Sequence, residues 1–345
     1  MKKLLFLGIL LLSLSIPVSA AIVAPEVPQD GQTVFPESQE NFGNSLWQML
    51  RRTLQQGQPA VASSAKLCLS VIGTTLVLSL LRSVEGKSKA VLELAGVICV
   101  SAIMLGSANS MIEQGTDTVW QISQYGKLLL PVMTAALAAQ GGSVSAASLY
   151  GASALFDTLL CSLISTVLVP MVYIYLILAI LNALTEDGIL KKLKDLCKWA
   201  MSWFFKVILY TFTGYITITG VIGGTADQTA IKATKLTISG MVPVVGGILS
   251  DASETILVSA GVVKNSAGVY GMLAILAVTL LPFFTIGVHY LLLKLTAAIC
   301  GVFAPNAVSA LLEDFSGAMG LSLAMVGSVC MIQLISVVCF LKGMS

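Results

Sequence analysis

Asp251 and Glu254 are the residues whose types and spacing point most directly to chemistry inside a membrane. They are three positions apart, so on a helix both carboxylates share one face. Two carboxylates on one face can bind a cation or relay protons. They suit equally well a helix start in contact with external water, where Ser250 would cap the backbone. Both interpretations remain open from the sequence.

These carboxylates lie in the stretch from Leu236 to Gly268, which is flanked by membrane-spanning sequence but is too interrupted to be a span itself. A polar, broken segment at membrane depth is tolerated only where protein or water surrounds it. Such a segment is therefore a default candidate for a functional site. Its candidate pathway and hinge residues are Gly246, Gly247, Ser250, Asp251, Ser253 and Glu254.

An earlier segment, Leu128 to Phe156, is related to this one. Its residues Gly141 to Ser148 match Gly246 to Ser253 at five of eight positions. The prolines agree with a duplication, because one offset relates the members of two pairs: Pro131 with Pro243, and Pro170 with Pro282.

We therefore expect an internal repeat with units at about residues 128–224 and 240–341. Transport proteins often place their pathway between such repeats, at discontinuous helices. Small residues also simply allow helices to pack closely, so a packing role stays equally open. The candidate hinge residues of the first unit are Gly141, Gly142, Ser145 and Ser148.

The composition indicates an all-α polytopic membrane protein. Hydrophobic residues make up 56% of the 345-residue chain and charged residues only 10%, against about a quarter charged in a soluble domain. A net charge of +2 provides no basic face for nucleic acid. The 7 cysteines contain no CxxC pair, so we expect neither a disulfide framework nor a zinc site. No P-loop, dinucleotide fingerprint or nucleophile elbow is present, and we expect no cofactor, no metal and no enzymatic activity.

The order of segments predicts three regions. Residues 1–20 have the features of a signal peptide, with an uncleaved first helix as the alternative. Residues 21–65 form an extracytoplasmic segment that begins as a flexible tail. It contains an amphipathic helix from Phe42 to Leu54, able to lie on a membrane surface or to pack on the bundle. Residues 66–345 form the membrane domain.

The membrane domain is predicted to contain about six transmembrane helices and two re-entrant helical hairpins. The helices are Leu67–Leu81, Ala90–Ile112, Thr158–Leu184, Val207–Gly223, Val269–Leu293 and Ala318–Leu341. The hairpins are Leu128–Phe156 and Met241–Val263, whose arms are too short to cross a bilayer alone. We expect an external loop over Glu113–Lys127 and a cytoplasmic connection over Thr296–Ser316.

Ile189 to Lys206 is the most basic stretch of the chain, with apolar residues at helical spacing between the lysines. This pattern predicts an interfacial helix, and the positive-inside rule places it in the cytoplasm. It reaches that side only if Leu128–Phe156 enters and leaves the membrane on one face, which favours the re-entrant interpretation. The candidate residues for docking a cytoplasmic partner are Lys191, Lys192, Lys194 and Lys198.

Two isolated polar residues in the spans have simple expected roles. Asp157 should open a span, where a carboxylate suits a helix N-terminus. His289 is the only histidine, and no partner residue has the spacing of a metal ligand. We expect its ring to pack inside the protein and to form hydrogen bonds there.

Several second-half segments resemble the stage III sporulation protein AE family: Gly240 to Gly247, Ser253 to Thr255, Val263 to Ser266, and Gly287 to Cys300. The likeness extends over most of the chain from the first span to the last. It implies a protein of endospore-forming bacteria, placed in the mother-cell membrane that surrounds the forespore. The family belongs to a secretion-like channel complex with a motor ATPase and ring-forming proteins. No catalytic residue is established for the family, so the residues above rest on pattern alone.

Two functional classes follow. The first is a non-enzymatic integral membrane component of that channel complex, in contact with membrane lipid and the other complex proteins. The second is a stand-alone secondary transporter or permease for a small solute or ion, with Asp251 and Glu254 coupling ion movement. A transporter should move a solute when reconstituted alone, whereas a channel subunit should be inert without its partners.

Overall fold

The computed structural model describes residues 25–36, 42–84, 89–139, 143–185, 188–218 and 266–343. These ranges contain helices and short turns but no strand, which confirms the predicted all-α fold. The elements are α2 (Gln29–Gln32), α3 (Phe42–Val84), α4 (Lys89–Ala139), α5 (Ser143–Leu163), the π-helical turn η1 (Ile164–Leu168), α6 (Val169–Thr185), α7 (Gly188–Ile218), α10 (Ser266–Cys300) and α11 (Asn306–Gly343).

Five helical runs among the described residues are long and apolar enough to cross a membrane. They are Phe42–Ser83, Ala90–Ala138, Ala146–Thr185, Gly268–Cys300 and Asn306–Lys342. Helices suit this environment because every backbone N–H and C=O is satisfied within the segment, where no water is available. The polytopic character expected from the composition is therefore matched by the structure.

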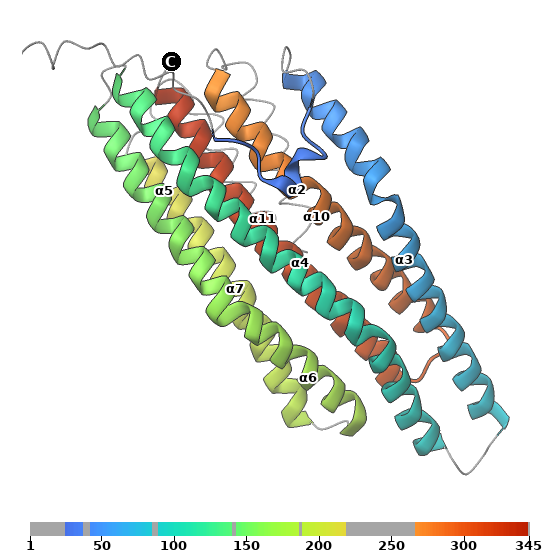
Figure 1. The fold of residues 1–345 in the computed structure, drawn as a ribbon. Coiled ribbons are helices and arrows are strands. Elements are labelled where there is room, and N and C mark those ends of the chain that lie inside the picture. The colour runs from blue at the N-terminus through green and yellow to red at the C-terminus, as the bar shows by residue number, and fades with distance from the viewer. Residues whose placement is uncertain are drawn as a thin grey trace, which may run out of the picture.

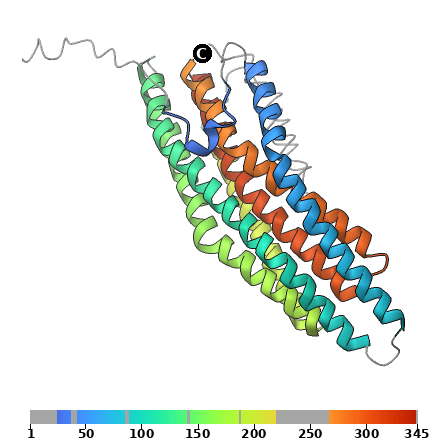
Figure 2. The same cartoon turned by 45° about the vertical axis from the view of Figure 1, so that its right-hand side comes forward.

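The long helices lie side by side in one elongated bundle (Figures 1 and 2). The C-terminal ends of α3, α6 and α10 and the N-terminal ends of α4, α7 and α11 gather at the lower end of Figure 1. We call this the basic end, because Arg82, Lys191 and Lys192 lie in the adjoining helix turns. The other end, where α4 ends and α5 begins, is called the opposite end.

The bundle is longer than a bilayer is thick. Helix α4 has 51 residues, or about 76 Å at about 1.5 Å per residue. The hydrocarbon core is only about 30 Å thick, and even a tilt of about 40° does not make up the difference. Part of the bundle must therefore lie outside the hydrocarbon region.

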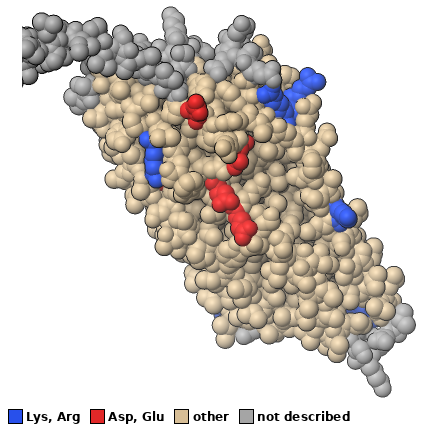
Figure 3. Space-filling model, in the orientation of Figure 1, with Lys and Arg blue, Asp and Glu red and all other residues tan. Residues whose placement is uncertain are grey.

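One stretch of α4, called the uncharged belt below, has the length of a membrane crossing. Between Glu93 and Glu113, α4 carries no charged residue from Leu94 to Ile112. That stretch spans about 28 Å, which matches the core thickness. In Figure 3 the charged side chains on the visible face gather mainly in the upper half, and the region below them is nearly free of charge. The half of α4 nearer the basic end therefore has the length and composition of a membrane crossing.

Helices α5 and α6 form one continuous run with η1 between them. Pro170 explains the π-helical turn, because its ring has no N–H and would clash with the carbonyl four residues earlier. Widening the backbone over Ile164–Leu168 relieves that clash. A helix can therefore pass through the proline and continue to Thr185.

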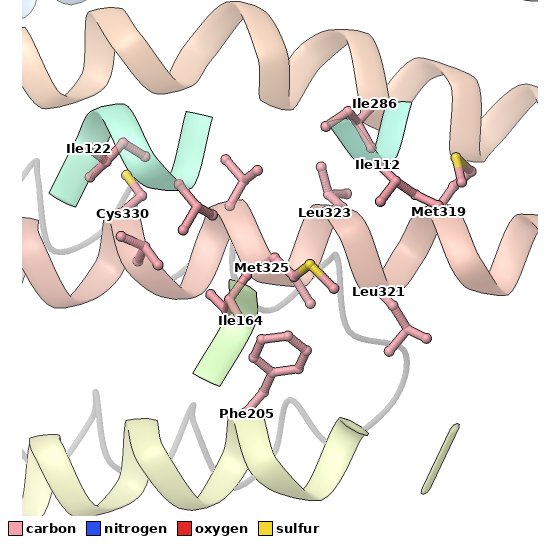
Figure 4. Close-up of a cluster of buried hydrophobic side chains, with 14 of the residues drawn as sticks. Ile112, Ile122, Ile164, Phe205, Ile286, Met319, Leu321, Leu323, Met325 and Cys330 are labelled. Atoms are coloured by element: carbon pink, nitrogen blue, oxygen red, sulfur yellow. The ribbon is translucent and has the colours of Figure 1, made fainter. Parts of the chain in front are cut away.

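Helix α11 is the centre of the core. In its most apolar stretch 83% of residues are buried, against 22% for α3. A helix that is apolar on all sides must be surrounded by others, and its small residues let neighbours approach closely. Figure 4 shows side chains around α11 on two sides, from Ile112 and Ile286 to Ile164 and Phe205. The second half of the chain thus provides the inner helix and the first half wraps it.

Residues 25–36 are folded onto the bundle, whereas their prolines predicted a flexible tail. Val27 and Val34 are buried, and the Phe35 ring packs on Tyr270 of α10 with centroids 5.1 Å apart. The Gln56 amide on α3 donates to the Thr33 carbonyl at 3.1 Å. The amphipathic stretch from residue 42 is simply the first part of α3, which packs against α10.

Several predicted boundaries are wrong because charged residues were taken as loops. The external loop Glu113–Lys127 is a continuous part of α4. The cytoplasmic connection Thr296–Ser316 shrinks to residues 301–305, since α10 ends at Cys300 and α11 begins at Asn306. The separate interfacial helix and the span Val207–Gly223 are largely one helix, α7, which runs along the bundle (Figure 1).

The re-entrant hairpin over Leu128–Phe156 is not confirmed. Helix α4 continues to Ala139 without reversal, and α5 begins at Ser143 and packs back against it. The chain therefore reverses at the opposite end of the bundle, and both arms belong to long helices. The second predicted hairpin, Met241–Val263, lies outside the described residues.

Candidate functional site: buried polar groups within the bundle

The predicted hinge residues fall mostly outside the residues that the structure describes. Gly141 and Gly142 lie between α4 and α5, and the whole set from Gly246 to Glu254 precedes α10. Ser145 is helical, in the first turn of α5. Ser148 is half-buried and engaged with a neighbouring residue. Whether the two hinge motifs lie close together is therefore a question that falls outside the described residues.

The predicted docking lysines divide into two groups. Lys191, Lys192 and Lys198 are exposed on α7. Trp199 and Trp203 are also exposed on this helix, and their rings stack with centroids 6.4 Å apart. Lysine and tryptophan together are typical of a membrane–water boundary. This exposed face of α7 remains available to a lipid headgroup or a partner protein.

Lys194 is different, because it is buried against α11. Its Nζ atom lies 2.6 Å from Oδ2 of Asp314, and the two residues are only 7% and 8% exposed. The Tyr175 hydroxyl on α6 donates to the other carboxylate oxygen of Asp314 at 2.9 Å. This buried triad joins three helices near the basic end. Lys194 is therefore not accessible for docking a partner protein.

The surroundings of the triad leave little free space. A Cβ atom on Gly317 of α11 would lie 3.1 Å from the Tyr175 hydroxyl and 3.3 Å from Nζ of Lys198. Glycine at this position therefore lets α11 pack closely against α6 and α7. A buried ion pair is stabilising only when its geometry and remaining hydrogen bonds are good. Here both carboxylate oxygens of Asp314 have donors, as that condition requires.

Sequence reasoning did not find Asp314 or Tyr175. Asp314 was assigned to a cytoplasmic connection, and Tyr175 lies in an apolar run. One signal was present: the adjacent carboxylates Glu313 and Asp314 precede the last apolar stretch and have the opposite charge to the lysine-rich helix. Matching an acidic pair with the basic segment would have suggested the contact.

His289 has the packing role expected for it. It is buried on α10, with Nδ1 3.0 Å from the Ser64 hydroxyl of α3 and Nε2 3.2 Å from the Ser107 hydroxyl of α4. Because an imidazole bonds through both nitrogens, the ring joins three helices. Among the described residues no group of three or more His, Cys, Asp and Glu side chains could hold a metal ion.

A second buried carboxyl group lies toward the opposite end. Asp157 was expected at a helix N-terminus, but it lies well inside α5 and is 2% exposed. The Ser123 hydroxyl of α4 donates to its Oδ2 atom at 2.7 Å. The helix start that the sequence suggested is at Ser143, so the N-terminal role is wrong.

Comparison with known proteins identifies the family to which the chain belongs. Residues 32–343 match the family described as Stage III sporulation protein AE. A relative from Bacillus subtilis (strain 168) with that name is 23% identical over 280 residues, which cover 80% of this chain and 70% of the relative. No solved structure matches the chain.

Proposed function

Because the chain belongs to the stage III sporulation protein AE family, with a role in sporulation, we propose that it is a non-enzymatic membrane component of a channel complex between mother cell and forespore. It would lie in the mother-cell membrane that surrounds the forespore. The basic end would face the mother-cell cytoplasm, and the opposite end the space between the two cells.

The main observation in support is the distribution of charge along the bundle. The basic residues Arg82, Lys191 and Lys192 lie in helix turns that meet at one end. Lysine and arginine are enriched on the cytoplasmic side of membrane proteins. The acidic residues Glu113 and Asp117 are exposed on α4 beyond the uncharged belt. This orientation also agrees with an exported N-terminal region.

The length of the bundle supports a role in an assembly. Helix α4 continues beyond Ile112 for about 40 Å to Ala139. A projection of this length offers a surface for proteins located between the two membranes, such as ring-forming partners. The exposed lysines of α7 offer a second surface on the cytoplasmic side, suited to an acidic face of a motor ATPase.

Charge reversal tests the cytoplasmic surface. The double variant Lys191→Glu and Lys192→Glu should reduce co-purification of the complex ATPase with the full chain at least tenfold, and should lower spore yield. Both side chains are exposed, so the fold should be kept. The matched control reverses Arg51 and Lys127, which are exposed on α3 and α4 in the half of the bundle away from the basic end.

Equal co-purification from the two double variants would contradict the docking role of α7. If both variants bind the ATPase normally and spore yield is unchanged, the proposed orientation loses its support as well. Membrane extraction and detergent melting of each variant establish that the protein is inserted and folded.

A further inference from the structure

The surroundings of Asp157 contain more polar atoms than hydrogen bonds. Its Oδ2 atom accepts from Ser123 at 2.7 Å, but the buried Oδ1 atom has no hydrogen-bond partner in the described structure. Ser153, one turn earlier on α5, is 1% exposed, and its hydroxyl also lacks a partner there. A buried unsatisfied polar group destabilises a fold by about 1–3 kcal/mol. Several in one place therefore need an explanation.

Gln333 of α11 completes the cluster. Its side chain is fully buried and lies beside the Asp157 carboxyl group. Neither its Nε2 nor its Oε1 atom has a partner at full hydrogen-bond geometry, but the carboxamide is close enough to interact with the Asp157 carboxyl group. The side chain lies directly over Gly126 of α4, where a Cβ atom would overlap the carboxamide. Three helices, α4, α5 and α11, thus enclose a carboxyl group and a carboxamide.

No cation close enough to form a salt bridge balances Asp157 within the described residues. On α4 the nearest charge is the Lys127 ammonium, which is exposed and acts only at a distance. On α5 the Cys161 thiol lies nearby. On α7 the Tyr215 ring packs against the residue before Asp157, and on α11 the Cys330 thiol is buried on a neighbouring turn.

The cluster contains neutral donors, the Gln333 carboxamide and the Ser153 hydroxyl, but no group that balances the charge of an ionised Asp157. Asp157 Oδ1 and Gln333 Oε1 are both acceptors without a donor at full hydrogen-bond geometry in the described structure. An isolated ionised carboxylate in a low-dielectric core is so unfavourable that the group normally neutralises instead. A proton on Oδ1 turns that atom into a donor toward Oε1 and removes the uncompensated charge, so one proton resolves both difficulties.

We propose that Asp157 is a proton-binding site in the core of the bundle, with the bound proton held between its carboxyl group and the Gln333 side chain. Ser123 and Gln333 are positioning residues, and Gly126 provides the space for the carboxamide. The ligand is a proton and not a metal cation, because the cluster contains one carboxyl group only.

Infrared spectroscopy on the full chain in detergent tests this directly. At neutral pH the wild-type protein should show the carbonyl stretch of a neutral carboxylic acid, and Asp157→Asn should lack it. Asn reproduces the donor toward Gln333, so this variant should remain folded. As a second variant, Gln333→Met removes the acceptor, and the acid band should remain but move to the frequency of a free carboxyl group. If no acid band is lost in Asp157→Asn, the proposal is wrong.

The pH dependence of unfolding gives an independent measurement. The unfolded Asp releases its proton above about pH 4, whereas the folded protein retains it. The unfolded state then binds fewer protons, so stability falls as pH rises, by up to about tenfold in the unfolding constant per pH unit. Asp157→Asn should lack this component. Equal slopes for the two proteins would overturn the proposal.

A comparison of two salts distinguishes a bound proton from a bound metal cation at Asp157. The unfolding midpoint is measured in sodium chloride and in choline chloride at equal ionic strength. A proton site predicts the same midpoint in both salts. A sodium-specific rise in the wild type that is absent in Asp157→Asn would show a metal cation at the site, and would overturn the assignment of a proton.

Discussion

Replacing Lys194 with methionine should destabilise the protein by about 3–5 kcal/mol, the range measured when one partner of a buried ion pair is removed. The size follows from burial, since Lys194 and Asp314 are 7% and 8% exposed. The Nζ–Oδ2 distance of 2.6 Å leaves no room for water between them. After the substitution Asp314 would keep only the hydrogen bond from Tyr175 and would carry an uncompensated charge.

Arg82 and Glu93 provide the matched control for this change. Their closest N–O distance is 3.9 Å, and their side chains are 38% and 27% exposed. Exposed pairs contribute about 0–1 kcal/mol, so Arg82→Met should have a small effect. The double variant Lys194→Met with Asp314→Asn should recover much of the lost stability, because neither residue then leaves a charge behind.

The assay is equilibrium unfolding of the purified full chain in mixed detergent micelles, followed by helical circular dichroism. The cycle Lys194→Met, Asp314→Asn and the double variant gives the interaction energy between the two sites. If Lys194→Met destabilises no more than Arg82→Met, the triad is not a buried ion pair, and the assignment of Lys194 to the core is wrong.

Two further predictions concern helix contacts. Gly57→Ala should destabilise the protein by about 1–3 kcal/mol, because the added Cβ atom would overlap the Phe284 ring of α10. Gly73→Ala on the same helix is the control, because a Cβ atom there meets nothing within 4 Å. This control should be neutral or stabilising by up to about 1 kcal/mol. His289→Leu should cost about 1–3 kcal/mol by leaving the buried Ser64 hydroxyl without its partner. Unfolding midpoints of the purified variants check both, and equal midpoints for the two glycine variants would contradict the close α3–α10 contact.

Membrane-spanning helices could be predicted from the sequence where the hydrocarbon core of the membrane requires a long run of apolar residues. The stretch Ala90–Ile112 was predicted to be a span because it is almost free of charge. It forms part of α4, within a helical run that is long and apolar enough to cross a membrane. The residues from Glu113 to Lys127 were taken for a loop because they are polar. Polarity reports contact with water and does not report backbone conformation. A helix that leaves the membrane and continues through water has the same composition as a loop.

The buried polar contacts could not be predicted because they join residues far apart in the chain. Lys194 and Asp314 are separated by 120 positions, and the amphipathic pattern of α7 alone cannot show which lysine faces a neighbouring helix. Asp157 was assigned by its place at the edge of an apolar run, but the helix begins earlier, so it lies in the core. A repeated motif can be recognised in the sequence, whereas the tertiary partners of single residues cannot.

The orientation of the bundle is the claim on which the proposed function depends. It is tested by labelling single cysteines in a background from which the native thiols, free in the described structure, have been removed. When the protein is expressed in the cell membrane of cells without a forespore, an impermeant maleimide applied to intact protoplasts should label Gln55→Cys on α3. It should label Lys191→Cys on α7 only after permeabilisation, since both positions are exposed. Labelling of both cysteines from the same side of the membrane would contradict the orientation and the cytoplasmic docking surface with it.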